Sequence, residues 1–190
     1  MIKAICFDFD GVVRKGEYFS DRLPRKYPSV TSEDILSILK NDWKKAQLGK
    51  MTMNQVWEKH LKSWKISMNL KQMFEFWFGE EHLDKGIMKI IDKLRLNAKV
   101  YLVTNNPAER MNYFDKRDKL FNHFDNIIIS SNIGAFKTSK KVANKICELA
   151  RAKSNEIIVV DNSQSDLSKY EKHGFKTIFY TNPSELKKLL

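Results

Sequence analysis

Short apolar runs recur along the chain, and each one ends in polar or turn-forming residues. The first run, Ile2–Phe9, is followed by Asp-Gly. The later runs are Val100–Val103, Ile127–Ile129, Ile157–Val160 and Thr177–Tyr180. Apolar runs of this length, bounded by turn signals, predict buried β-strands. Because they are apolar on both faces, they indicate a parallel sheet of about five strands that is covered on both sides.

Apolar residues at helical spacing fill the intervals between these runs. The stripes are Ile87/Ile90/Ile91/Leu94, Val142/Ile146/Leu149 and Leu167/Tyr170, and two further helices are expected to begin near Pro107, with Asn106 as the N-cap, and near Pro183. Gly174 is a stop signal for the helix that precedes it. Alternating strands and helices predict a doubly wound, Rossmann-like α/β fold.

The stretch from Arg14 to Leu83 interrupts this alternation. It contains no apolar run typical of a buried strand, but it carries three aromatic-rich helical stripes: Ile35/Leu39/Trp43, Trp57/Leu61/Trp64, and Met73, Phe74, Trp77 and Phe78. We therefore expect a small all-helical cap domain at residues 14–83, inserted into an α/β core domain made of residues 1–13 and 84–190. The aromatic residues are interpreted as the packed core of this cap. An insert of this size can cover a site at the strand ends and exclude water.

Composition narrows the class of protein. The chain has 190 residues, of which 42% are hydrophobic and 30% charged, as in globular proteins. No stretch approaches the roughly 20 apolar residues of a membrane span, and the N-terminus lacks the pattern of a signal peptide, so a cytoplasmic protein without a membrane partner is expected. The net charge is +11, but the lysines are spread along the whole chain. We interpret this charge as a solvated surface that attracts anionic phosphate esters, and we expect no nucleic-acid partner.

Candidate catalytic residues stand where the predicted strands end, which is where open α/β sheets bind ligands. Asp8 and Asp10 leave the first strand together, and Gly11 allows a sharp turn after them. One carboxylate of such a pair can attack phosphorus, while the other protonates the leaving oxygen and later activates water. An ordinary Asp-rich turn would explain the same residues if they stood alone.

Three further strand ends carry residues that suit phosphate chemistry. Thr104 and the amides that follow it open a helix, where a phosphoryl oxygen is readily bound. Lys137, after the third strand, suits the neutralisation of charge between a nucleophile and a phosphate. Asp161, Asn162 and Asp166 follow the fourth strand, and their oxygens suit Mg²⁺. Each of these signals is weak alone, since helix capping or a surface lysine explains it equally well.

Together these segments resemble the four motifs of the haloacid dehalogenase-like hydrolase superfamily. DFDGV at residues 8–12 resembles the first motif of its phosphatases, Asp-x-Asp-Gly followed by Thr or Val. LVTNN at 102–106, SSNIGAFK at 130–137 and VVDNSQSD at 159–166 resemble the second, third and fourth motifs. The resemblance covers almost the whole chain, and the helical insert matches the family's cap in type and place.

The resemblance implies a role for each matching residue. Asp8 would be the nucleophile, Asp10 the general acid/base, Thr104 and Asn105 the phosphoryl-binding residues, and Lys137 the cation that holds nucleophile and phosphoryl group. Asp8, the backbone carbonyl of Asp10, Asp161, Asn162 and Asp166 would bind Mg²⁺. Dehalogenating members lack an acid at the position of Asp10, so its presence favours phosphoryl chemistry.

Two positions depart from the family pattern. Thr138 stands where Pro usually follows the motif lysine, and Asn162 stands where an Asp commonly binds the metal. Because an amide oxygen brings no charge, the second departure predicts weaker Mg²⁺ binding.

The function expected from these features is a Mg²⁺-dependent phosphatase acting on a small phosphorylated metabolite through an aspartyl-phosphate. A phosphomutase on the same scaffold and a degenerate, non-catalytic member that binds a phosphate ligand or a partner are the alternatives. The sequence does not decide which cap residues face the site; the candidates are Arg14, Lys15, Arg22 and Trp43. Nothing in the sequence indicates the oligomeric state.

Overall fold

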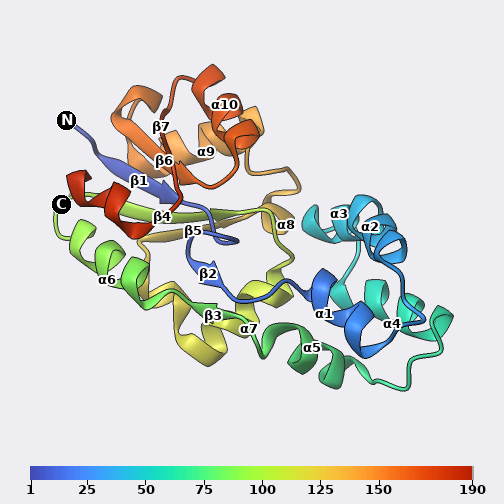
Figure 1. The fold of residues 1–190 in the computed structure, drawn as a ribbon. Helices are drawn as coiled ribbons and strands as arrows, with labels where there is room; N and C mark the ends of the chain where they lie inside the picture. Colours follow the sequence, from blue (N-terminus) through green and yellow to red (C-terminus); the bar gives the residue numbers. More distant parts are fainter. Residues whose placement is uncertain (190) are drawn as a thin grey trace.

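The computed structural model describes residues 1–189, and its centre is a parallel five-stranded sheet (Figure 1). The strands are β1 (Ala4–Phe7), β4 (Lys99–Thr104), β5 (Asn126–Ile129), β6 (Ile157–Asp161) and β7 (Lys176–Phe179). Their spatial order is β5-β4-β1-β6-β7, with β1 in the middle. All five predicted runs form these strands, and the doubly wound α/β fold is confirmed.

Helices cover both faces of the sheet because alternate strand residues point to opposite sides. Ile5 and Phe7 belong to one apolar cluster, with α6 (Lys85–Leu94) and α7 (Ala108–Asp118). Ala4 and Cys6 belong to the other, with α9 (Lys140–Ala150) and α10 (Gln164–Lys172). The shorter helical segments are α8 (Ser130–Ile133), η1 (Leu120–His123), η2 (Ser154–Glu156) and η3 (Pro183–Leu189).

Five helices occupy the insert between the first and second sheet strands along the chain. They are α1 (Phe19–Lys26), α2 (Ser32–Lys40), α3 (Asp42–Gln47), α4 (Met53–Ser63) and α5 (Leu70–Phe78). Capping boxes begin three of them, at Thr31, Thr52 and Asn69. The insert helices lie together beyond the carboxyl ends of the sheet strands, beside α7 and α8 (Figure 1).

The stripe Ile35/Leu39/Trp43 does not lie on one helix, so this prediction is wrong in part. Asn41 has φ −115° and ψ −85°, and its side-chain amide donates to the carbonyl of Ser37, which ends α2. Trp43 lies on the separate helix α3. The apolar spacing hides the break because the residues of both helices face the same core.

A short ribbon that the sequence pattern did not predict joins the two ends of the insert. Strand β2 (Arg14–Lys15) pairs antiparallel with β3 (His82–Leu83). Two-residue strands are too short to produce an alternating pattern. The ribbon brings the chain that enters the insert next to the chain that leaves it.

The apolar core continues from the sheet into the insert. One buried cluster contains Phe7 of β1 and Phe114 of α7 together with Trp57 and Trp77 of the insert helices. The division into two domains at residues 14 and 83 stays a prediction. None of the helices within residues 1–189 is long and apolar enough to cross a membrane.

Substitution of Gly16 is expected to destabilise the protein at the ribbon. Gly16 has φ +113°, and a Cβ there would lie 2.4 Å from the carbonyl oxygen of Glu80. We expect Gly16→Ala to lower the free energy of unfolding by about 2 kcal/mol or more, because backbone has to move. Gly134→Ala is the control: Gly134 has φ +68° and open space around it, so only about 1 kcal/mol should be lost. Urea unfolding measures both, and equal losses would contradict the close approach.

Candidate active site

The order of the strands places the predicted site residues at one edge of the sheet. β1 lies between β4 and β6, so Asp8, directly after β1, is flanked by the ends of the strands that carry Thr104 and Asp161. The backbone amide of Asp8 donates to the carbonyl of Val160 at 3.0 Å, which continues the β1–β6 pairing. This is the point at which the strand order reverses, where open sheets of this type form their ligand crevice.

Lys137 is the centre of a buried cluster of charges. Its Nζ lies 2.9 Å from Asp8 Oδ1, 2.6 Å from Asp161 Oδ2 and 3.4 Å from Asp166 Oδ2. Asp8, Asp161 and Lys137 are all buried. Four of the predicted residues, from three separate strand ends, therefore meet at one ammonium group.

Neighbouring groups hold the backbone of Lys137 on both sides. Its amide donates to Asn105 Oδ1 at 2.7 Å, and its carbonyl accepts from the Tyr170 hydroxyl at 2.8 Å. Asn105 therefore positions Lys137, in addition to standing next to Thr104. The anchoring fixes the ammonium group among the carboxylates although Lys137 lies on a loop.

Burial and the charges of this cluster change the pKa of Asp8. Burial raises the pKa of its carboxyl to about 7, and the carboxylates of Asp161 and Asp10 add to this, while the ammonium group of Lys137 opposes it. Burial would lower the pKa of Lys137, but Asp8 and Asp161 reverse this and raise it above its ordinary value. The lysine is thus charged, and one ammonium group faces more negative charge than it can offset.

Asp10 lies in a different environment from Asp8. Its carboxylate accepts from Arg14 Nε at 3.0 Å, from both terminal nitrogens of Arg110 at 2.9 Å, and from Asn106 Nδ2 at 2.9 Å. Burial alone would raise the pKa of Asp10, but the guanidinium groups of Arg110 and Arg14 outweigh it and hold the pKa well below its ordinary value. Asp10 is therefore ionised in this arrangement.

Glu81 completes the group around Asp10. Its carboxylate lies 2.8 Å from Arg110 Nη2 and 3.7 Å from Arg14 Nη1. Arg14 is in β2 and Glu81 directly precedes β3, so both ends of the insert reach this group: Arg14 contacts Asp10 and Glu81, and Glu81 contacts Arg110 of α7. The geometry couples the position of Asp10 to the ribbon that joins insert and core.

The expectation that Asn106 caps α7 is wrong. The cap position is Pro107 and receives no side-chain hydrogen bond. Asn106 Nδ2 donates to Asp10 and, at 2.7 Å, to Thr104 Oγ1, and its Oδ1 accepts from Arg110. The site retains this amide because the charged carboxylate of Asp10 and guanidinium group of Arg110 form stronger hydrogen bonds with it than uncharged backbone amides do.

The residues expected at the metal are arranged unevenly. Asp161 and Asp166 face Lys137, whereas Asn162 is exposed, with its amide so close to Gly11 that a Cβ there would lie 2.2 Å away. Within residues 1–189 no group of three or more His, Cys, Asp and Glu side chains could hold a metal ion by itself. A cation here would need a mixed donor set that includes amide or backbone oxygens, as the sequence analysis expects.

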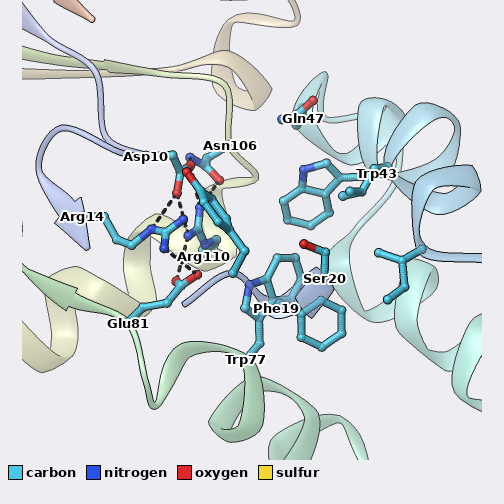
Figure 2. Close-up of a pocket in the computed structure, with 13 residues that line it drawn as sticks. Asp10, Arg14, Phe19, Ser20, Trp43, Gln47, Trp77, Glu81, Asn106 and Arg110 are labelled. Atoms are coloured by element: carbon cyan, nitrogen blue, oxygen red, sulfur yellow. Dashed lines mark hydrogen bonds and ion pairs between the residues drawn. The ribbon is translucent and has the colours of Figure 1, made fainter. Parts of the chain in front are cut away.

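A cavity of about 250 Å³ opens beside Asp10, between the core and the insert (Figure 2). Arg14 and Trp43, two of the four candidate cap residues, line it. Lys15 and Arg22 do not: Lys15 Nζ donates to the carbonyl of Gly11, and Arg22 donates to the carbonyl of Trp77. The cavity thus meets the predicted site at Asp10.

Arg110 and Glu81 were missed by the sequence analysis. The signal for Arg110 was its position four residues before Phe114, on the buried face of α7, where a charged residue requires a partner. Glu81 carried no such signal, because it stands in a turn beside another glutamate.

Comparison with known proteins was consistent with this architecture. The family model of the haloacid dehalogenase-like hydrolases matches residues 2–168. The pyrimidine 5'-nucleotidase YjjG of Escherichia coli (strain K12) is 26% identical over 143 residues, which are 71% of this chain and 64% of that protein. The chain thus spans less than two thirds of the length of this relative.

Solved structures share the fold. A family enzyme of Bacteroides thetaiotaomicron, a mutant in complex with magnesium and inorganic phosphate, superimposes with a TM-score of 0.81 at 16% identity, covering 95% of each chain. The L-2-haloacid dehalogenase of Xanthobacter autotrophicus has a TM-score of 0.67 at 17% identity, covering 93% of this chain and 76% of its own.

The raised pKa of Asp8 predicts a pH-dependent effect of replacing it. Between the ordinary carboxyl pKa of 3.8 and about 7, the folded protein holds a proton that the unfolded chain has lost, so stability falls as pH rises through this window. With a metal chelator present, the Asp8→Asn variant should therefore melt at a higher temperature than the parent protein. This difference should be larger at about pH 8 than at about pH 5.

Asp34→Asn is the matched control for this measurement. Hydrogen bonds from Thr31 lower the pKa of the exposed Asp34, so it is ionised at both pH values. Its substitution should shift the melting temperature equally at both. If Asp8→Asn shifted the melting temperature by the same amount at both pH values, this would contradict the raised pKa of Asp8.

Proposed function

The chain belongs to the haloacid dehalogenase-like hydrolases, and we propose that it is a Mg²⁺-dependent phosphatase that hydrolyses a small phosphate monoester through an aspartyl-phosphate on Asp8. One observation carries the proposal: the buried Asp8 carboxylate lies 2.9 Å from Lys137 Nζ at the reversal point of the strand order. The acid at position 10 favours phosphatase over dehalogenase chemistry, because displacement of a halide requires no proton donor.

The first step is attack of an Asp8 carboxylate oxygen on phosphorus. A bond forms between this oxygen and phosphorus, the ester P–O bond breaks, and the leaving alkoxide takes a proton from Asp10. Lys137 offsets the negative charge on the phosphoryl oxygens. Thr104 and Asn105, at the end of β4, bind and orient the phosphoryl group.

The second step is hydrolysis of the aspartyl-phosphate. A water oxygen attacks phosphorus, Asp10 takes the proton, and the bond to Asp8 breaks to release phosphate. Asp10 is ionised after the first step and can take this proton, but the low pKa that Arg110 and Arg14 impose in the present arrangement makes it a weak base. For the first step Asp10 has to carry a proton, so we expect its contacts with Arg110 to loosen when substrate is bound.

Oxygen donors for Mg²⁺ are available around Asp8. We propose Asp8, the carbonyl of Asp10, Asp161, Asn162 and Asp166 as the residues that hold it. The excess of carboxylates over Lys137 supports the fit, since three acids face a single ammonium group. When bound, the ion would offset charge on the phosphoryl oxygens and bring the pKa of Asp8 down into the range of a nucleophile.

The relative named a pyrimidine 5'-nucleotidase supports a small phosphorylated substrate. The insert supports it too, because helices that cover the strand ends restrict access for macromolecules. A cytoplasmic location fits such a metabolite and remains part of the proposal.

Substitution of the nucleophile tests the proposal directly. Asp8→Asn should lower phosphate release from a generic aryl phosphate by about a thousandfold or more, because an amide does not form the intermediate. Asp34→Asn, far along the chain in an exposed capping box, should retain full activity. Circular dichroism checks folding, and substantial turnover by Asp8→Asn would refute the assignment.

Restoring the usual Asp at position 162 is expected to increase the affinity for Mg²⁺. Asn162→Asp adds a carboxylate at an exposed position, so half-maximal activity should need severalfold less Mg²⁺. Asn132→Asp, also exposed, adds the same charge outside the fourth motif, at a residue that is not among the proposed metal ligands, and should leave the titration unchanged. Unaltered Mg²⁺ dependence of Asn162→Asp would show that residue 162 does not bind the ion.

A further inference from the structure

The cavity beside Asp10 has two chemically different ends. One end contains Asp10, Asn106, Arg110 and Glu81, and the other contains aromatic and aliphatic side chains of the insert. Figure 2 shows the charged group on one side of the cavity and Trp43 and Phe19 on the other. A phosphate ester bound at Asp8 and Asp10 would extend its leaving group toward the apolar end.

The charges at the polar end compensate one another. Arg110 pairs with Asp10 and Glu81 at 2.9 and 2.8 Å, and Arg14 pairs with Asp10 at 3.0 Å. Two cations therefore face two anions, and neither sign is in excess. A leaving group with its own charge would find no counter-ion, so an uncharged one fits best.

The apolar end is a rigid aromatic wall. Phe19 stacks on Trp77 with ring centroids 4.7 Å apart and an interplanar angle of 27°, and Trp43 lies against Trp77 at 4.9 Å. Trp57 packs edge-on behind both Phe19 and Trp77. Because each ring is held by the next, the wall offers flat surfaces that need not be ordered on binding.

Few hydrogen-bonding groups interrupt this wall. Besides Arg14 and Glu81 of the charged end, Tyr18, Ser20 and Gln47 are the polar side chains that the insert contributes to the cavity lining. Gln47 Nε2 already donates to the carbonyl of Asn105. A polyhydroxylated leaving group would lose hydrogen bonds to water and gain few here, which disfavours sugar phosphates.

We propose that the substrate is the phosphate monoester of an uncharged alcohol that carries a flat aromatic ring, with the ring lying against Phe19, Trp43 and Trp77. The volume of about 250 Å³ suits one ring and a short linker, since about 150 Å³ suffices for benzene. This rests on the proposed phosphatase function and adds the class of its leaving group.

Matched primary-alcohol phosphates test the proposal without the bias of leaving-group reactivity. Benzyl phosphate should have a higher kcat/KM than cyclohexylmethyl phosphate, and at least about tenfold higher than glucose 6-phosphate and phosphoserine. Equal values for the benzyl and cyclohexylmethyl esters would overturn the preference for a flat ring. A higher kcat/KM for glucose 6-phosphate or phosphoserine than for benzyl phosphate would overturn the whole assignment of the leaving group.

Binding to Asp8→Asn separates this proposal from the phosphatase function. Isothermal titration calorimetry with Mg²⁺ should rank benzyl phosphate above the other three compounds. If this ranking holds while the parent releases no phosphate, the ligand class stands and the phosphatase is wrong. If benzyl phosphate binds no more tightly than glucose 6-phosphate, the ligand class is wrong whatever the activity.

Substitutions in the aromatic wall test whether the ring of the substrate binds there. Trp43→Leu should raise the KM for benzyl phosphate about three- to tenfold and leave that for ethyl phosphate unchanged. Trp64→Leu is the control, because Trp64 is packed against Trp57 outside the cavity lining. Equal effects of Trp43→Leu and Trp64→Leu would contradict the placement of the ring.

Discussion

A single buried ammonium group shared by three carboxylates is the constraint on which the site depends. Lys137 contacts Asp8 directly after β1, Asp161 at the end of β6 and Asp166 in α10. Without this cation the carboxylates, which the paired strands β1 and β6 bring together, would repel one another in a largely buried place. The hydrogen bonds from Asn105 and Tyr170 to its backbone show that the surrounding fold holds the lysine in register.

Asp8 and Asp10 are two residues apart, yet their environments shift the pKa values of their carboxyl groups in opposite directions. Burial and the neighbouring carboxylates raise the pKa of Asp8 against the opposing effect of Lys137, whereas Arg110 and Arg14 lower the pKa of Asp10. Environments that separate the proton affinities of two acids are typical of acid/base pairs in enzymes. Arg110 of α7 makes the larger contribution to this separation, and Arg14 in the ribbon between insert and core adds to it, so the position of the insert and the protonation of Asp10 are physically linked.

The aromatic residues of the insert serve two purposes at once. The rings of Phe19, Trp43 and Trp77 are buried with at most 7% exposure and form part of the main apolar cluster. Their remaining surface lines the cavity beside Asp10. The same packing that stabilises the insert therefore also defines the shape of the space beside Asp10. Trp43 and Trp77 are core residues, as the sequence predicted, and they line the cavity in addition.

The sequence by itself determined the five strands, the doubly wound fold and the catalytic candidates, because burial imposes a local apolar pattern and parallel strands present their ends at one edge. It did not reveal the break at Asn41, the ribbon, or the roles of Asn106, Arg110 and Glu81. Only the tertiary structure decided these. The break at Asn41 was hidden because the helices on both sides of it pack on the same core. The ribbon and the roles of Asn106, Arg110 and Glu81 depend on partners up to 100 residues away, as between Arg110 and Asp10, and no local pattern records which distant charge a side chain will meet.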